Sequence, residues 1–272
     1  MTIEELIIYG KKFVSSSKAK MLLANILNYD TLELFLHLDQ KVSEEDIKIY
    51  KKHIEAVLNK YPIQYLIGKV NFYGYEFIIN DKVLIPRFET EQLVYRVLEF
   101  IKKNYTKPVN IIDLGCGSGV IGITLAKELS NSKVTCLDIS DDALEVTKEN
   151  AELLDVDIIL KKGDMLEGLN DSFDIIVSNP PYIALDEEIE EIVKNNEPHL
   201  ALYAGDDGLD CYRKIIQRVS SNINQKFLIA FEIGHTQADQ ISNIAYNNLT
   251  NINIEVFKDL AGKDRVVLIY SK

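Results

Sequence analysis

The apolar positions of the chain follow a helical period up to about residue 75. Three short groups, within residues 6–13, 22–27 and 32–36, have the spacing of amphipathic helices. The clearest helix begins at Ser43, whose hydroxyl suits an N-cap. Its apolar residues share one face: Ile47, Tyr50, Ile54, Val57, Leu58 and Tyr61. This pattern predicts a small helical bundle over residues 1–68, which either docks a substrate or covers the rest of the protein.

Residues 70–85 change to the alternating pattern of β-strands. Apolar side chains at positions 70, 72, 77, 79, 83 and 85 flank Asn80-Asp81, a dipeptide that favours turns. We therefore expect a β-hairpin linker over residues 69–86, built around that turn. The following segment, Pro86-Arg-Phe-Glu-Thr-Glu91, begins another helix and a third region, residues 87–272.

Strand and helix patterns then alternate along the third region. Apolar runs at 110–114, 133–138, 157–160 and 173–178 have the composition of buried parallel strands. A helical pattern follows the first run, and Ser140 is placed to cap the helix after the second. This order predicts an α/β fold with a doubly wound sheet, in which ligands bind at the carboxyl ends of the strands.

Glycines and acidic residues follow these predicted strands. Asn110-Ile-Ile-Asp-Leu-Gly-Cys-Gly-Ser-Gly119 has three alternate glycines, which permit a tight turn and close approach of a ligand to the backbone. Asp138 ends the next strand about twenty residues later, where a nucleotide ribose needs an acceptor. Gly163-Asp164-Met165 lies at the exit of the third strand. Taken singly, Asp138 could be a helix-capping acid and Met165 a core filler, but the set predicts a nucleotide-type site.

The fourth strand runs into Asn179-Pro-Pro-Tyr182. Neither proline has an N–H, so this stiff loop offers acceptors, the Asn179 amide oxygen and the Pro180 carbonyl. Two acceptors beside the Tyr182 ring suit a planar, uncharged NH2 group. The simpler interpretation is that Asn-Pro-Pro is only a turn after a strand.

Composition narrows the class of protein. The 272 residues contain no apolar run near the ~20 residues of a membrane span. Three scattered cysteines, at 116, 136 and 211, suit reduced thiols in the cytoplasm. The four histidines show no metal-ligand spacing, and we expect no metal.

The net charge of −12 is unevenly distributed. Residues 1–75 carry 10 Lys and 9 acids, which leaves 20 basic against 33 acidic residues, or −13, for the remainder. A charge of this sign disfavours binding to a nucleic-acid backbone and favours a basic protein partner.

The glycine loop, Asp138 and Asp164-Met165 together resemble the class I methyltransferases, which have a Rossmann-like, seven-stranded mixed sheet and use S-adenosylmethionine. The resemblance implies that residues of the loop line the cofactor, with Asp113 near its ammonium group. It also implies that Asp138 binds the ribose hydroxyls, that Asp164 and Met165 border the adenine, and that Asn179 borders the cofactor. The loop residues concerned are Gly115, Cys116, Gly117, Ser118 and Gly119.

Longer motifs resemble the protein-(glutamine-N5) methyltransferase family, HemK/PrmC, over the whole chain. They include Tyr61-Pro-Ile-Gln-Tyr-Leu-Ile-Gly68, Val83-Leu-Ile-Pro-Arg-Phe-Glu-Thr-Glu91, Glu197-Pro-His-Leu-Ala-Leu202, Glu232-Ile-Gly-His-Thr-Gln237 and Asp259-Leu-Ala-Gly-Lys-Asp-Arg265. The sequence departs from the family at Phe88, where a second proline is usual.

The resemblance implies methylation of the glutamine in the Gly-Gly-Gln motif of class 1 peptide chain release factors. We expect the protein to be a cytoplasmic monomer. Asn179, Pro180 and Tyr182 would be catalytic, and Pro181, Arg87 and Glu89 would also contact the substrate. A sister branch methylates a glutamine of a large-subunit ribosomal protein. The Asn-Pro-Pro-Tyr motif also occurs in adenine-N6 DNA methyltransferases, and a non-catalytic adaptor with a nucleotide-binding fold is a further hypothesis.

Overall fold

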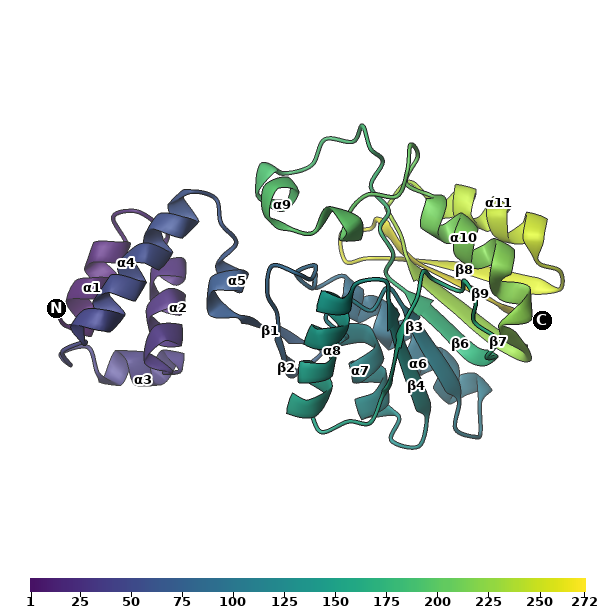
Figure 1. Ribbon diagram of the computed structural model, residues 1–272, viewed down its shortest axis with the longest axis horizontal. Helices are drawn as coiled ribbons and strands as arrows, with labels where there is room; N and C mark the ends of the chain where they lie inside the picture. Colours follow the sequence, from purple (N-terminus) through teal and green to yellow (C-terminus); the bar gives the residue numbers. More distant parts are fainter. The chain divides into compact units, whose positions relative to one another are not determined.

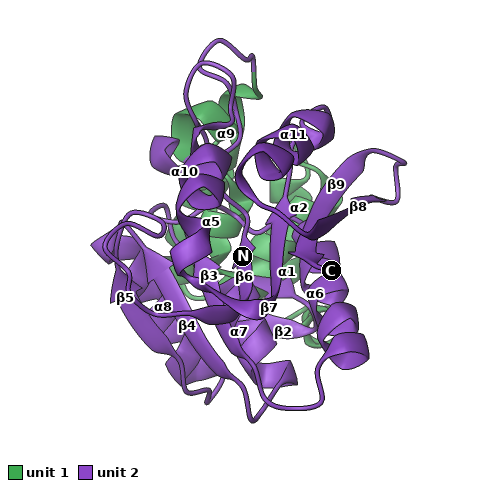
Figure 2. Ribbon diagram, turned by 90° about the vertical axis from the view of Figure 1, so that its right-hand side faces the viewer, with its two compact units in different colours: residues 1–69, 189–196 green, residues 70–188, 197–272 purple.

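The computed structural model describes residues 1–272 and divides into two units, coloured separately in Figure 2. Unit 1 comprises residues 1–69 and 189–196, and unit 2 comprises residues 70–188 and 197–272. The short segment 189–196 belongs to unit 1 because Glu191 forms an ion pair with Lys60, and Asn196 Nδ2 donates to the Lys60 carbonyl at 3.1 Å. The sequence pattern places this segment in the region 87–272 instead.

Unit 1 is the helical bundle that the N-terminal periodicity predicts. Its helices are α1 (Ile3–Gly10), α2 (Ser16–Leu27), α3 (Thr31–Leu36), α4 (Glu44–Leu58), α5 (Ile63–Ile67) and α9 (Glu191–Asn196). The side chains of Thr2, Ser15, Asp30 and Ser43 cap the first four helices. Tyr50 is fully buried and donates to the Ala19 carbonyl at 3.2 Å. A side chain at Gly10 would meet Tyr50 Oη at 2.1 Å, so only glycine fits beneath this ring.

Seven strands form the mixed sheet of unit 2, as predicted. They are β3 (Asn110–Leu114), β4 (Lys133–Asp138), β5 (Ile159–Lys162), β6 (Phe173–Ser178), β7 (Ile223–Glu232), β8 (Ile252–Lys258) and β9 (Asp264–Ser271). Their order is β5-β4-β3-β6-β7-β9-β8, and only the pairings of β9 are antiparallel. Strand β3 lies between β4 and β6, so the chain reverses its direction of winding there. This is the switch point at which open α/β sheets bind ligands.

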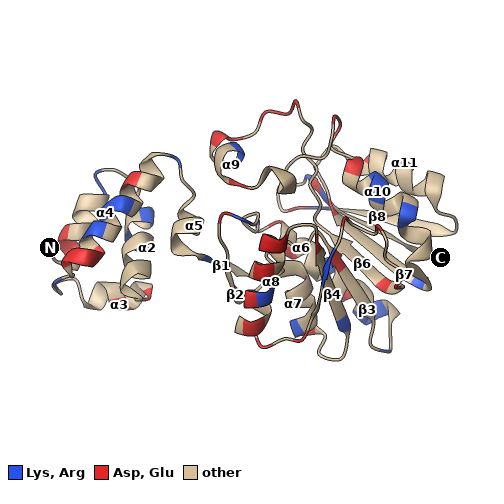
Figure 3. Cartoon of the chain, in the orientation of Figure 1, with Lys and Arg blue, Asp and Glu red and all other residues tan.

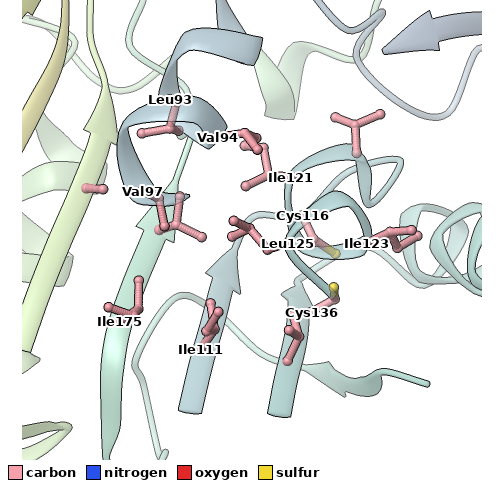
Figure 4. Packing of buried hydrophobic residues seen from close by; sticks show 14 of the residues in the cluster. Leu93, Val94, Val97, Ile111, Cys116, Ile121, Ile123, Leu125, Cys136 and Ile175 are labelled. Atoms are coloured by element: carbon pink, nitrogen blue, oxygen red, sulfur yellow. The ribbon is translucent and has the colours of Figure 1, made fainter. Parts of the chain in front are cut away.

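Helices cover both faces of the sheet (Figure 1). One layer contains α6 (Thr90–Asn104), α7 (Val120–Glu128) and α8 (Asp141–Leu153), and the other contains α10 (Asp210–Arg218) and α11 (Ala238–Asn248). Successive strand residues face opposite layers, so Ile111 packs in one core and Ile112 in the other. Figure 4 shows Leu93 and Val97 of α6 in the same core as Ile111. No helix is both long and apolar enough to cross a membrane.

The hairpin linker is present, but its predicted turn is wrong. Strands β1 (Lys69–Phe72) and β2 (Tyr75–Ile78) are joined by Tyr73 and Gly74, with φ of 52° and 84°. Two left-handed residues give the tight turn that matches the twist of the strands. Asn80 instead forms a separate turn after β2, in which its side chain accepts from the Lys82 N–H at 3.0 Å. Sequence alternation did not reveal that Tyr73 adopts a positive φ.

Candidate active site

A cavity of about 260 Å³ lies at the carboxyl ends of β3, β4 and β6. Nine residues that the sequence proposed for a site line it together: Gly115, Cys116, Gly117, Ser118, Asp138, Asp164, Met165, Asn179 and Pro181. They come from four separate loops, which meet because parallel strands end at the same edge of a sheet. The remaining residues proposed from sequence do not line this cavity.

Two of the three loop glycines leave room for a ligand. Gly115 and Gly117 have φ of 69° and 57°. A side chain at Gly117 would meet nothing within 4 Å, and one at Gly115 would meet only Met165 Cε, at 3.8 Å. Any larger residue at these positions would therefore project into the cavity. Gly119 has a different role, because a Cβ there would lie 2.7 Å from Ile123 Cδ1.

The Asp138 carboxylate is fixed by backbone donors. Its Oδ2 accepts from the Gly117 N–H and its Oδ1 from the Ser140 N–H, both at 2.9 Å. Thr147 supports the same loop by donating its hydroxyl to the Gly117 carbonyl at 2.9 Å. Asp138 is 8% exposed and lines the cavity, so lone pairs of a preorganised carboxylate face the space that a ribose would occupy.

Asp113 is fully buried behind the loop and does not line the cavity. Its Oδ2 accepts from the Gly122 N–H at 2.9 Å, near the start of α7, whereas its Oδ1 has no partner. Burial raises the pKa of Asp113 to about 7, against the lowering effect of the Gly122 hydrogen bond, and nearby Asp138 raises it further. In this structure Asp113 positions α7, and a contact with a cofactor remains a prediction.

The Asn-Pro-Pro-Tyr loop contains two acceptors that receive no hydrogen bond from the chain, of which only Asn179 belongs to a residue that lines the cavity. Asn179 Nδ2 donates to Thr90 Oγ1 at 3.3 Å, while no group of the chain donates to Asn179 Oδ1 or to the Pro180 carbonyl. Tyr182 packs among the residues under α10 and α11, and burial raises its pKa to about 12. Its carbonyl accepts from Gln237 Nε2 at 3.0 Å, which holds the far end of the loop.

Arg87 is engaged within the protein. Its guanidinium lies 2.5 Å from Oε1 of Glu197, whose other oxygen accepts from the Ile85 N–H at 3.1 Å. Glu197 is 5% exposed, so this pair holds the segment before α6 against the segment after α9. Glu89 and Phe88 are both exposed, and a substrate contact for Glu89 or Arg87 remains a prediction.

Sequence reasoning missed several residues that support the site. Asn150 Nδ2 donates to the carbonyls of Ser118, at 2.9 Å, and Ile78, at 2.8 Å, and so joins the glycine loop to the hairpin. Thr90 lines the cavity and accepts from Asn179 Nδ2 at 3.3 Å, and Glu232 lies buried beside Thr90. Both belong to the quoted family motifs, but only the fold brings the motifs together.

Comparison with known proteins decides the family. Residues 15–68 match the model of the PrmC N-terminal domain, and residues 95–201 match that of the methyltransferase small domain. A protein of Clostridium botulinum named release factor glutamine methyltransferase is 42% identical over 92% of this chain and 89% of its own length. One of the same name from Streptococcus pneumoniae is 36% identical over 98% and 94%. This chain belongs to the release factor glutamine methyltransferase family.

A solved structure supports the fold of this family member. The T. thermophilus 16S rRNA N2 G1207 methyltransferase, in complex with S-adenosylmethionine and guanosine, is 13% identical and superposes with a TM-score of 0.54 over 75% of this chain and 50% of its own. The predicted family and the predicted methyltransferase fold are therefore confirmed.

Proposed function

We propose that this protein transfers a methyl group from S-adenosylmethionine to the side-chain amide nitrogen of the glutamine in the Gly-Gly-Gln motif of class 1 release factors. The observation that carries the proposal is the free acceptor Asn179 Oδ1 on a residue that lines the cavity, followed directly in the chain by the Pro180 carbonyl, which also receives no hydrogen bond. An amide NH2 has two hydrogens for two such acceptors. The likeness to the named relatives, over nearly the whole chain, supports the release factor as acceptor.

The residues around the cavity suit the cofactor. S-adenosylmethionine supplies an electrophilic sulfonium methyl, so the reaction requires no metal or covalent intermediate. Gly115 and Gly117 give its methionine and ribose portions room against the backbone. Asp138 would accept hydrogen bonds from the ribose hydroxyls, and Asp164 with Met165 would border the adenine. Asp164 is held there by Lys214, whose Nζ lies 2.5 Å from its Oδ2.

The protein's main task is to make an amide nitrogen reactive. That nitrogen is a poor nucleophile because its lone pair is delocalised into the carbonyl. Asn179 and Pro180 bind both amide hydrogens and orient the nitrogen toward the methyl group. Stacking of the Tyr182 ring on the amide plane, as predicted from sequence, requires this ring to turn out of its packing under α10 and α11, since it does not line the cavity. As the N–C bond forms and the bond between the methyl group and sulfur breaks, positive charge develops on nitrogen. Both acceptors bind this nitrogen more strongly than the neutral amide, which lowers the barrier. S-adenosylhomocysteine leaves, and the alkylated nitrogen then loses one proton to water. Orientation alone can contribute up to about 7–11 kcal/mol.

We also propose that unit 1 docks the release factor. Large apolar side chains of this unit are exposed, among them Ile8, Phe13, Met21, Leu32, Phe35 and Leu36. The acidic character of the rest of the chain suits a basic partner and disfavours DNA as the acceptor. Figure 3 colours several positions of α8 as acidic, and Asp141 and Asp142, at the cavity end of this helix, are exposed. A cytoplasmic monomer remains our expectation.

Methyl transfer to candidate acceptors tests this function. Labelled S-adenosylmethionine would be supplied with a release factor, its Gln→Ala variant, ribosomal proteins and duplex DNA in parallel. We expect label on the release factor alone and none on its Gln→Ala variant. Label on the ribosomal fraction only would assign the chain to the sister activity, and label on DNA would overturn the proposal.

Asn179→Ala tests the role of the acceptors. The variant is expected to bind S-adenosylmethionine with nearly unchanged affinity and to lose at least about 100-fold in kcat, comparable to removing one preorganised hydrogen-bonding group from an oxyanion hole. Asn131→Ala, at an exposed turn before β4, is the matched control. A kcat for Asn179→Ala within threefold of the wild type would reject the role of this side chain.

A further inference from the structure

A buried carboxylate lies directly behind the Asn-Pro-Pro-Tyr loop. Glu232 ends strand β7 with 1% of its surface exposed, and its Oε2 has no hydrogen-bond partner. The Thr90 hydroxyl lies beside this carboxylate, and hydrogen bonding between the two lowers the pKa of Glu232 against the larger effect of burial. Thr90 is the first residue of α6, is 2% exposed, and lines the cavity beside Asn179. Burying a carboxylate that is only partly hydrogen-bonded lowers the stability of the fold, which suggests that Glu232 has a functional role.

These contacts form a chain with a fixed direction. An ionised carboxylate only accepts hydrogen bonds, so the Thr90 hydroxyl must donate its single hydrogen to Glu232. The lone pairs left on Thr90 Oγ1 then require a donor, which is Asn179 Nδ2 at 3.3 Å. Asn179 can satisfy this requirement only with its nitrogen toward Thr90 and its oxygen away from it.

We propose that Thr90 and Glu232 are positioning residues that select the orientation of the Asn179 amide and so keep its Oδ1 available to the substrate's amide hydrogen. The inference deepens the proposed function and rests on it. With the opposite orientation, Asn179 would present an NH2 group to the NH2 group of the substrate, and neither could accept from the other. The chain of hydrogen bonds therefore determines which atom of Asn179 faces the substrate. With Oδ1 facing it, the site offers two acceptors, whereas with Nδ2 facing it, the site offers one donor and the Pro180 carbonyl.

The protonation state of Glu232 controls this direction. When protonated, the carboxyl can donate to Thr90 Oγ1, and the Thr90 hydrogen is then free to turn to Asn179 and favour the inactive orientation. Burial raises the pKa of Glu232 to about 7, opposed by the Thr90 hydrogen bond. The charged and titratable groups that face it are Arg265 of β9, Arg87 and Glu89 before α6, Tyr182 after β6 and Tyr212 of α10. Neither an amide nor a sulfonium titrates near neutral pH, so kcat should fall below about pH 7. Asp113, behind the glycine loop, also has a pKa raised to about 7, so this fall belongs to Glu232 only if Glu232→Gln abolishes it.

Kinetics of three variants test the inference. Thr90→Val removes the hydroxyl and should lower kcat about 10–100-fold, because small misplacements of a catalytic group have effects of this size. The KM for the release factor and the Kd for S-adenosylmethionine should change less than threefold. Thr90→Ser should restore most of kcat. Glu232→Gln keeps an acceptor for Thr90 and should lose the fall of kcat below pH 7. Thr106→Val, at an exposed loop, is the matched control.

A second measurement is independent of the acceptor. The side-chain NH2 resonances of Asn179, assigned in 15N-labelled protein by their absence in Asn179→Ala, should titrate with Glu232 in the wild type and not in Glu232→Gln. If Thr90→Val retains kcat within threefold and these resonances do not titrate, the positioning role is wrong. Loss of methyl transfer by the wild-type protein itself, with the titration intact, would instead reject the proposed function and leave the hydrogen-bond chain standing.

Discussion

Replacing Asp138 by alanine is the sharpest test of how the cavity holds its cofactor. The carboxylate lines the cavity, is 8% exposed and is already oriented by the N–H groups of Gly117 and Ser140, both at 2.9 Å. The substitution removes the proposed acceptor of two ribose hydroxyls and one anchor of the glycine loop. We therefore expect weaker binding of S-adenosylmethionine with the fold retained.

The magnitude follows from the two ribose hydrogen bonds. A hydrogen bond to a charged group contributes about 1.5–3 kcal/mol, so two contribute about 3–6 kcal/mol. Since each 1.4 kcal/mol is tenfold in affinity, the Kd should rise by about 10²–10⁴. Asp138→Asn keeps one acceptor oxygen and should fall between the wild type and Asp138→Ala.

Titration calorimetry with S-adenosylmethionine measures both variants. Asp157→Ala is the matched control, because Asp157 is exposed just before the amino end of β5 and does not line the cavity. Circular dichroism confirms that each variant is folded. A Kd for Asp138→Ala within threefold of the wild type would refute the assignment of the ribose site.

Two further predictions concern the supports of the site. Asp113 has a pKa of about 7, raised from 3.8 by burial, so its contribution to stability is lost as the pH rises from about 4 to 7. Each pKa unit is worth about 1.4 kcal/mol, so the free energy of unfolding of Asp113→Asn, relative to that of the wild type, should rise by on the order of 2–4 kcal/mol between pH 5 and 8. An equal difference between the two proteins at both pH values, measured by urea unfolding, would contradict this. Asn150→Leu leaves the backbone groups of Ile78 and the Ser118 carbonyl without their buried hydrogen-bond partner, and should lower the free energy of unfolding by about 3–5 kcal/mol. A decrease below about 1 kcal/mol would show that other contacts hold the hairpin.

The sequence predicted which residues of the glycine loop and the following strand end meet at the cavity, because each lies directly after a strand. Gly115, Gly117 and Asp138 each follow directly from a strand with a strong apolar pattern, and parallel pairing brings the strand ends together. Asn179 was found for the same reason, at the end of β6. The fold class followed from this alternation of strands and helices.

The supporting residues were not predictable, because their partners are distant in sequence. Glu197 lies 110 residues from Arg87, and Asn150 lies 72 residues from Ile78. Nothing in the local sequence distinguishes such a buried polar residue from a solvent-exposed one.

The prediction of the hairpin turn was wrong for another reason. Asn80-Asp81 is a good turn sequence, but the two strands reverse at Tyr73-Gly74.

The most direct test of the central claim is the chemical form of the transferred methyl group. A release factor labelled by this protein would be hydrolysed in acid, which releases methylamine from an N-methylated side-chain amide but not from a methyl group on carbon or sulfur. We predict that the label appears as methylamine and that peptide mass spectrometry places it on the glutamine of the Gly-Gly-Gln motif. Label that remains on another amino acid, or that survives the Gln→Ala change, would contradict the account.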